Sequence, residues 1–366
     1  MKKDKKLTTV IEKAIQKINN GNWDSALSIL QKHCKKTPQN ASTPLNIGLF
    51  FQSNNMPIKA EIFYSQSLEI TPDQPVILFN LGVIYQSLNR LNDAIKAYTH
   101  AIDLDPNYAK CYANLGYVYN EINDQKNSQK YCKQALKLSP NDPQIGHMLA
   151  SLNVTATPDT ADENYIKNVF DNYADNYDQH LVDGLKFKIP KLIFDAISQH
   201  LPSKKTLDII DLGCGTGLSG ELFSATANTL VGVDLSEGMI QKAKEKAIYT
   251  KLHIGEIDAV IKDYTLEFDL AICSDVLIYI GKLDVLFRHI QASLNKKGQF
   301  CFSIEALSDS KSDYTLGSTG RYKHNQDYIS KVAISAGFEI ISNEEASLRK
   351  QDNQDVLGRI YILKKI

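Results

Sequence analysis

An aliphatic residue followed by glycine recurs every 34 residues in the first half of the chain. The three copies are Ile47-Gly48, Leu81-Gly82 and Leu115-Gly116. A unit of this length is long enough for two antiparallel helices, and it buries its apolar face only by stacking on the next unit. The glycine lets the two helices cross closely. The period therefore predicts an all-α array of stacked helix pairs.

Other positions repeat with the same period. The aromatic residues are Phe51, Tyr85 and Tyr119; the small residues are Ala60, Ala94 and Ser128; and prolines close the units at Pro72, Pro106 and Pro140. This pattern resembles the tetratricopeptide repeat. A less regular copy runs from Leu7 to Pro38, so we expect four repeats and a capping helix in residues 1–152, followed by a linker at 153–162.

A glycine-rich loop follows a short apolar strand in the second half. Residues 207–217 read Leu-Asp-Ile-Ile-Asp-Leu-Gly-Cys-Gly-Thr-Gly, and a second apolar run ends at Asp234. Glycines at this point let the backbone turn tightly, so that a nucleotide-sized ligand can approach bare amide groups. The string therefore predicts a ligand site at the carboxyl edge of a parallel sheet.

Two features of this string argue against a dinucleotide. The fingerprint Gly-x-Gly-x-x-Gly needs a third glycine at position 218, which is Leu218 here. Asp211 would repel a pyrophosphate but suits a cation, and Asp234 is placed to accept hydrogen bonds from ribose hydroxyls. A positively charged adenosine without phosphate fits both carboxylates.

These residues resemble the first two motifs of class I S-adenosylmethionine-dependent methyltransferases. The resemblance implies a Rossmann-like α/β domain over residues 163–366, after the all-α repeat array, with S-adenosyl-L-methionine as cofactor. A doubly wound domain without a ligand is the alternative. The implied cofactor-binding residues are Asp211, Gly213, Cys214, Gly215, Gly217, Asp234, Leu235, Glu256, Ser274, Asp275, Tyr173 and Tyr177.

Among these, Tyr173 and Tyr177 belong to a Tyr-Ala-x-x-Tyr-Asp segment that resembles the lid of many such enzymes. Aromatic faces near a sulfonium would attract it, and closure would exclude water. An amphipathic helix on the sheet edge is the other interpretation. Glu256 follows Gly255, where the family usually has aspartate for the adenine amino group, and Ser274-Asp275 follows the fourth strand.

The segment Gly320-Arg-Tyr-Lys-His324 resembles a Gly-Arg-Tyr-x-His segment of predicted bacterial methyltransferases with fused tetratricopeptide repeats. Arg321 and Tyr322 are candidate substrate contacts, and His324 is a candidate general base beside Asp275. A surface loop is the alternative for the segment. For Asp275, the alternative is that it only orients the cofactor.

Asparagine recurs at the same repeat position as Asn46, Asn80 and Asn114. Amides spaced along a groove can pair with the backbone of an extended peptide, as in the asparagine ladder of the O-GlcNAc transferase repeats that they resemble. Local packing is the alternative. We therefore expect a protein or peptide partner in the repeat groove.

Composition limits the remaining possibilities. The net charge of −1 gives no overall attraction to nucleic acid, and the six cysteines form no Cys-x-x-Cys pair or zinc spacing, which predicts reduced thiols and no metal. No stretch resembles a signal peptide or reaches the ~20 apolar residues of a membrane span. These features favour a cytoplasmic protein, and they leave its oligomeric state open.

The combined prediction is a methyltransferase whose repeats recruit a substrate, more readily a protein or peptide than a metabolite. Two alternatives stay open. One is O- or N-methylation of a small molecule, with the repeats used for oligomerisation. The other is a non-catalytic repeat scaffold joined to a cofactor-sensing domain.

Overall fold

A computed structural model describes most of the chain: residues 9–10, 12–14, 16–17, 22–36, 39–54, 56–152, 156–174, 177–179, 188–201, 206–264, 268–308, 311–351 and 354–366. The chain divides into two compact units, Met1–Ile145 and Gly146–Ile366, and the division falls inside helix α9 rather than after residue 152. Leu7, Pro38 and the start of the expected linker, 153–155, lie outside the described residues.

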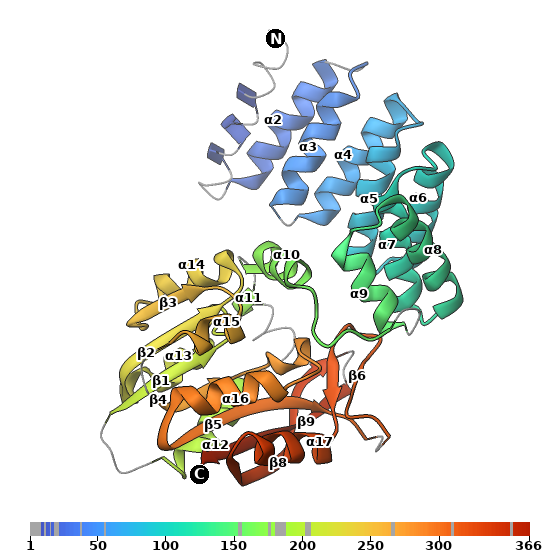
Figure 1. The fold of residues 1–366 in the computed structure, drawn as a ribbon. Helices are drawn as coiled ribbons and strands as arrows, with labels where there is room; N and C mark the ends of the chain where they lie inside the picture. Colours follow the sequence, from blue (N-terminus) through green and yellow to red (C-terminus); the bar gives the residue numbers. More distant parts are fainter. Residues whose placement is uncertain are drawn as a thin grey trace. The chain divides into compact units, whose positions relative to one another are not determined.

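The first unit is built from antiparallel helix pairs, as the 34-residue period predicts (Figure 1). Helix α3 packs on α4, α5 on α6, and α7 on α8. The bounds are α2 Trp23–Lys36, α3 Ser42–Ser53, α4 Pro57–Ile70, α5 Pro75–Ser87, α6 Leu91–Leu104, α7 Ala109–Glu121, α8 Gln125–Leu138 and α9 Pro143–Ser151. The expected capping helix at 144–152 corresponds to α9.

The repeated glycines lie where the two helices of a pair approach most closely. A Cβ atom on Gly82 would lie 2.4 Å from Cε1 of Tyr98, and Gly48 has the same relation to Tyr64. Tyr98 is fully buried, and its hydroxyl donates to Oε1 of Gln86 at 2.6 Å. Glycine is therefore needed at these positions so that a large aromatic ring can fill the seam.

Gly82→Ala should destabilise the repeat unit by about 1–3 kcal/mol, because the new methyl group overpacks the seam against Tyr98. Urea unfolding followed by circular dichroism measures the effect. Gly146→Ala is the matched control, since no atom lies within 4 Å of its added Cβ and alanine favours a helix. Equal midpoints for Gly82→Ala and the wild type would contradict the packing explanation.

The second unit is an α/β domain around one nine-stranded sheet. The strands are β1 Leu207–Leu212, β2 Ala227–Asp234, β3 Lys251–Ile254, β4 Phe268–Cys273, β5 Leu294–Ala306, β6 Tyr314–Leu316, β7 Tyr322–His324, β8 Phe338–Gln351 and β9 Gln354–Lys365. The helices are α10 Glu163–Tyr173, α11 Tyr177–Gln179, α12 Ile189–Ser198, α13 Leu218–Phe223, α14 Glu237–Glu245, α15 Ile257–Lys262, α16 Asp284–Ser293 and α17 Gln326–Ser335, with 3₁₀ turns at Ser224–Thr226 (η3) and Leu277–Tyr279 (η4).

Five strands pair in parallel in the order β3-β2-β1-β4-β5, and they include the predicted strands before the glycine-rich loop, Asp234 and Ser274-Asp275. The order reverses next to β1, where a doubly wound sheet opens a crevice at its carboxyl edge. Ser236 caps α14, because its hydroxyl accepts from the Met239 amide at 3.1 Å. The predicted strands thus deliver Asp234 and Asp275 to one edge.

Strands β6, β7, β8 and β9 of the sheet were not expected from the sequence. Residues 338–365 form a long antiparallel hairpin, β8-β9, whose second strand pairs with β5. Part of the segment 320–324 is strand β7 rather than a loop, since it pairs with β5 and β6. Strand β7 has only three residues and β8 is largely polar, so neither resembles a central strand; the apolar run of β9, residues 360–363, was not recognised as one.

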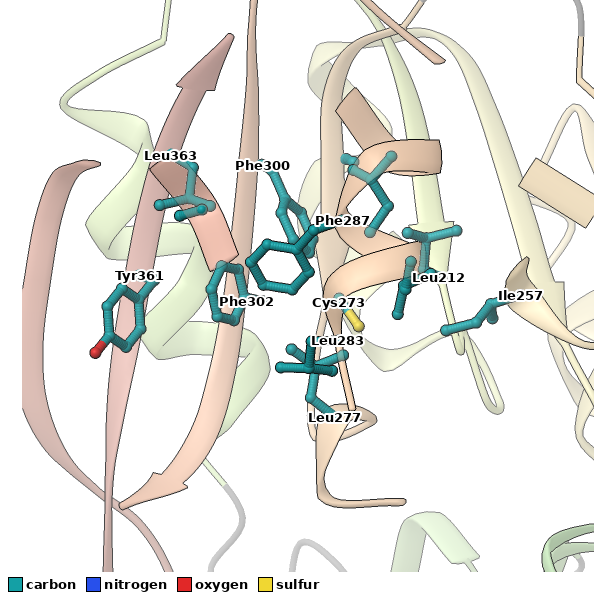
Figure 2. Packing of buried hydrophobic residues seen from close by; sticks show 14 of the residues in the cluster. Leu212, Ile257, Cys273, Leu277, Leu283, Phe287, Phe300, Phe302, Tyr361 and Leu363 are labelled. Carbon is teal, nitrogen blue, oxygen red and sulfur yellow. The ribbon is translucent and has the colours of Figure 1, made fainter. Parts of the chain in front are cut away.

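Apolar side chains pack on both faces of the sheet. On one face, residues of α15, α16 and α17 cover the strands, and Figure 2 shows Phe287, Phe300, Phe302 and Tyr361 gathered there. On the other face, α12 and α13 pack against β1, β4 and β9. Among the described helices, none is both long and apolar enough to cross a membrane.

Candidate functional site

The loop after β1 is shaped by its glycines. Gly213 has φ +73°, and a Cβ there would lie 2.2 Å from a methyl carbon of Val276. Gly215 has φ +53°, but its added Cβ would meet only Cε1 of Tyr177, at 3.9 Å. The first glycine is therefore required by packing, and the second leaves bare backbone facing open space.

Asp234, at the end of β2, holds this loop in place. One carboxylate oxygen accepts from the Gly215 amide at 2.9 Å and the other accepts from the Ser236 amide at 2.9 Å. Each oxygen keeps a further lone pair for a ligand hydroxyl. Asp234 thus fixes the loop and offers acceptors at the same time.

A pocket that is open to solvent lies at this edge of the sheet. The predicted site residues that line it are Tyr177, Gly213, Gly215, Asp234, Leu235, Glu256, Ser274 and Asp275. No lysine, arginine or histidine is among the described residues of the lining, so the pocket favours a cation over a phosphate.

Glu256 has two functions in this pocket. Its carboxylate caps α15 by accepting from the Ala259 amide at 3.3 Å, and the residue also lines the pocket. Burial raises its pKa above the ordinary value. The longer side chain that replaces the family's aspartate therefore still reaches the pocket.

Aromatic rings form one wall. Phe170 of α10 meets Tyr279 edge to face, with ring centroids 5.5 Å apart, and Tyr177 meets Phe170 at 6.0 Å. All three line the pocket. Their faces can attract a cation placed among them.

Hydrogen bonds anchor the segment that contains Tyr177 at two places. Asp171 of α10 accepts from the hydroxyl of Ser236 at 2.6 Å and from the Gly238 amide at 3.2 Å. Asp178 of α11 accepts from the hydroxyl of Thr216 in the glycine-rich loop. The described part of α10 and α11 is therefore held against the glycine-rich loop and α14, as a lid would be.

Residues 158–161 complete the same wall. The Ala161 amide donates to the carbonyl of Tyr279 at 2.9 Å, and the carbonyl of Asp159 accepts from the amides of Gly281 and Lys282, both at 2.9 Å. Thr160 and Ala161 line the pocket. The second part of the expected linker is thus fixed structure in this domain.

A buried charge cluster lies behind Asp275. Nη1 of Arg349 donates to Oδ1 of Asp275 at 2.8 Å, and Nη2 donates to the carboxylate of Glu305. Arg349, from β8, is 2% exposed. Arg321 contributes a second positive charge near Asp275 and is hydrogen-bonded to Tyr279. Sequence reasoning missed Arg349, because nothing in the β8 segment marks it as a site residue.

A family model described as "Methyltransferase domain" matches residues 203–351, and two models described as "Tetratricopeptide repeat" match residues 75–108 and 109–142. The chain contains a methyltransferase domain behind tetratricopeptide repeats. Each matched repeat is 34 residues long, the period that the sequence shows. The fold class predicted from the sequence is confirmed as well.

Curated relatives of the methyltransferase domain have diverse names. The carboxy-S-adenosyl-L-methionine synthase of Campylobacter curvus is 29% identical over 180 residues, which cover 45% of this chain and 72% of that protein. The mitochondrial ubiquinone biosynthesis O-methyltransferase of Saccharomyces cerevisiae is 25% identical over 132 residues, which cover 35% of this chain but only 42% of that protein. Among solved structures, magnesium protoporphyrin IX methyltransferase from Synechocystis with bound SAH matches with a TM-score of 0.44 and 16% identity, over 56% of this chain and 100% of that one.

The pocket fits the cofactor of the methyltransferase domain. S-adenosylmethionine supplies a methyl group activated by a sulfonium charge, and it is the cofactor of this domain. The bare backbone at Gly215, the acceptors of Asp234 and Glu256, and a lining without basic side chains suit a cationic adenosine. The aromatic wall would exclude water around it.

Four predicted cofactor residues of the methyltransferase domain do not line the pocket. Asp211 is fully buried, and its Oδ2 accepts from the hydroxyl of Tyr249 at 2.7 Å, while burial raises its pKa to about 7. Cys214 is buried beneath the loop, Gly217 caps α13, and Tyr173 meets the ring of Tyr177 edge to face. Their contact with the cofactor stays a prediction.

The segment 320–324 serves the fold more than the pocket. Tyr322 is fully buried and its hydroxyl donates to the carbonyl of Pro158 at 2.9 Å. Nε2 of His324 lies 2.9 Å from the carbonyl oxygen of Ile280 and 3.1 Å from that of Gly281. The other ring nitrogen, Nδ1, is buried and has no hydrogen-bond partner among the described residues, and His324 is not among the residues that line the pocket, so its role as a general base stays a prediction.

His324→Gln should retain methyl transfer at pH 8 within about threefold, whereas removal of a general base costs about 10²–10⁴. Burial lowers the pKa of His324 to about 4 from 6.5. The unfolded chain therefore binds this proton more readily, and wild-type stability falls as the pH drops from about 6.5 towards 4. The variant should lack that part of the pH dependence in thermal unfolding; a hundredfold loss of rate would instead support a base.

The asparagines of the repeats differ from one another. Nδ2 of Asn46 donates to the carbonyl of Ser42 in its own helix at 2.8 Å, and Nδ2 of Asn114 donates to the hydroxyl of Tyr98 at 3.1 Å. Asn80 is 9% exposed. Local hydrogen bonds thus engage two of the three amides, and peptide binding by this ladder stays a prediction.

Proposed function

We propose that this protein transfers a methyl group from S-adenosylmethionine to a protein or peptide that its repeat unit recruits. The observation that supports it is the fusion of a pocket with an acidic, aromatic lining to tetratricopeptide repeats in one chain. In the pocket, Asp234 and Glu256 accept hydrogen bonds from the adenosine, and the lid residue Tyr177 excludes water. The main contribution to rate is alignment of the acceptor with the methyl group, worth up to about 7–11 kcal/mol.

The repeat unit presents a basic surface for such a partner. Lys126, Lys130, Lys133 and Lys137 of α8 are spaced so that they fall on one helical face, and all four are exposed. Within the described residues none of them forms an ion pair, and α8 contains no aspartate or glutamate. At 1.5 Å per residue, this lysine stripe is about 16 Å long.

The lysine stripe is a property of this helix rather than of the repeat. The positions equivalent to Lys126 and Lys137 are Asn92 and Asp103 in α6, and Ile58 and Glu69 in α4. The aromatic ring of Tyr131, beneath Lys130 at 4.9 Å from its Nζ, adds an apolar contact. Charge complementarity therefore favours an acidic polypeptide segment as the recruited partner.

The test uses the full chain, labelled S-adenosylmethionine and a lysate of the source cells. Changing all four lysines of the stripe to glutamine should lower labelling of protein about tenfold in 0.15 M salt, where surface charges still act over about 8 Å. Lys244, Lys296, Lys331 and Lys350 are exposed lysines of the other unit, and changing them to glutamine is the control. Equal labelling by the two variants would exclude the stripe as the recruiting surface.

Methylation of a small molecule is the second candidate, because the relatives include an O-methyltransferase of ubiquinone biosynthesis and a synthase that makes a small sulfonium compound. In the same lysate experiment, label found only in small solutes would support this candidate against a protein acceptor. Cofactor binding without any labelled product would instead favour the non-catalytic scaffold.

A further inference from the structure

The starting observation is that Asp275 reaches the pocket with only part of its carboxylate available. Its backbone is left-handed, with φ +59°, and its amide donates to the hydroxyl of Ser303 at 2.9 Å. Oδ1 is bound by Arg349 at 2.8 Å. The side chain is 14% exposed, so its opening to the pocket is narrow.

A left-handed conformation is uncommon for residues other than glycine, although aspartate adopts it more readily than most. The hydroxyl of Ser303 and the guanidinium of Arg349 both act to hold it. With Oδ1 occupied, Oδ2 is the atom that remains for a ligand. The direction of the carboxylate is thus set by a residue more than seventy positions away in the sequence.

The charges around Asp275 balance. Asp275 and Glu305 carry two negative charges, and Arg349 and Arg321 carry two positive ones. Tyr177 and Tyr279, from the lid and from η4, also face Asp275, and Cys273 lies beside it. Arg349 is the cation in direct contact with both carboxylates, so its removal would leave two buried anions near one remaining arginine.

We propose that Arg349 is a positioning residue: it holds Asp275 ionised and orients Oδ2 as a hydrogen-bond acceptor for the cationic ligand of the pocket. In this arrangement Asp275 is a fixed anion and not the general base. This proposal depends on the proposed function only because that function names S-adenosylmethionine as the ligand of the pocket.

Removing Arg349 should make the charge of Asp275 sensitive to pH. Burial already raises the pKa of Asp275, while Arg349 and Arg321 lower it. Without Arg349 the pKa rises further, and the folded variant then binds a proton more tightly than the unfolded chain. Its stability therefore falls relative to the wild type as the pH increases from the ordinary aspartate value through the raised one.

The first measurement needs no ligand. Two variants are unfolded by heat at pH 5 and at pH 8: Arg349→Met, and the charge-balanced double variant Arg349→Met/Glu305→Gln. For both, the decrease in Tm relative to the wild type should be about twice as large at pH 8 as at pH 5. Arg359→Met is the matched control, because Arg359 of β9 binds Asn343 and Glu345 away from the pocket. The same decrease at both pH values in the double variant would mean that Arg349 only fills space, and would overturn the proposal.

The second measurement is calorimetric titration of the same proteins with S-adenosylmethionine between pH 5 and 8. The double variant should bind about tenfold more weakly than the wild type at pH 6 and recover towards pH 8, where Asp275 ionises. A weakening that is equal at all pH values, or wild-type affinity throughout, would overturn the proposal. A wild-type chain that binds no S-adenosylmethionine would refute the proposed function and leave the unfolding result to decide the role of Arg349.

Discussion

Asp234→Asn should weaken the binding of S-adenosylmethionine by about 10- to 150-fold. The carboxylate of Asp234 accepts from the amides of Gly215 and Ser236, and hydrogen bonds to a charged group are worth about 1.5–3 kcal/mol. Asparagine keeps one acceptor but turns an NH₂ group towards one of the two donors. The glycine-rich loop then loses its fixed position, and the ligand loses an ionised acceptor.

Isothermal titration calorimetry measures this loss, with thermal unfolding as a check on the fold. Asp208→Asn is the matched control: Asp208 lies at the other end of β1, where it accepts from the side chains of Asn228 and Thr229. The control should bind the cofactor as the wild type does. If the two variants bound equally well, Asp234 would have no part in the cofactor site.

Phe302→Ala should destabilise the methyltransferase domain by about 3–5 kcal/mol, the largest effect on stability that we expect. Phe302 of β5 is fully buried, and its ring stacks on Tyr361 at 5.2 Å and on Phe300 at 4.6 Å. Figure 2 shows these rings with Phe287 at the centre of the cluster. Truncation removes the ring from all of these contacts and leaves a cavity.

Urea unfolding monitored by tyrosine fluorescence measures the change, and the transition of the domain should move to lower urea. Ile334→Ala in α17 is the control, because Ile334 is 66% exposed and its truncation should cost less than about 0.5 kcal/mol. A midpoint for Phe302→Ala close to that of the control would show that the cluster relaxes around the lost ring.

The sequence predicted those structural features that depend on a few neighbouring residues. The glycine-rich loop and the strand end at Asp234 follow from a few adjacent residues, and the structure places them as expected. The repeat period likewise predicted the close contact of glycine with the neighbouring helix, of which Gly82 and Tyr98 are one instance.

Long-range pairing was not predictable in the same way. The hydroxyl of Tyr249, which lies beyond β2 and α14, donates to Oδ2 of Asp211, and the sequence did not predict this contact. Arg349 reaches Asp275 only because the β8-β9 hairpin folds back along β5. A single sequence gives no signal for such a contact, because nothing near Arg349 marks its partner.

The backbone hydrogen bonds between residues 158–161 and the loop at 279–282 determine where the chain can be shortened for experiments. The family model matches only residues 203–351, yet Thr160, Phe170 and Tyr177 lie outside that range and form part of the pocket wall. A chain shortened to the matched range would keep most of the sheet but lack β9 and one side of its binding site. The matched range thus contains the glycine-rich loop, whereas part of the pocket wall lies upstream of it.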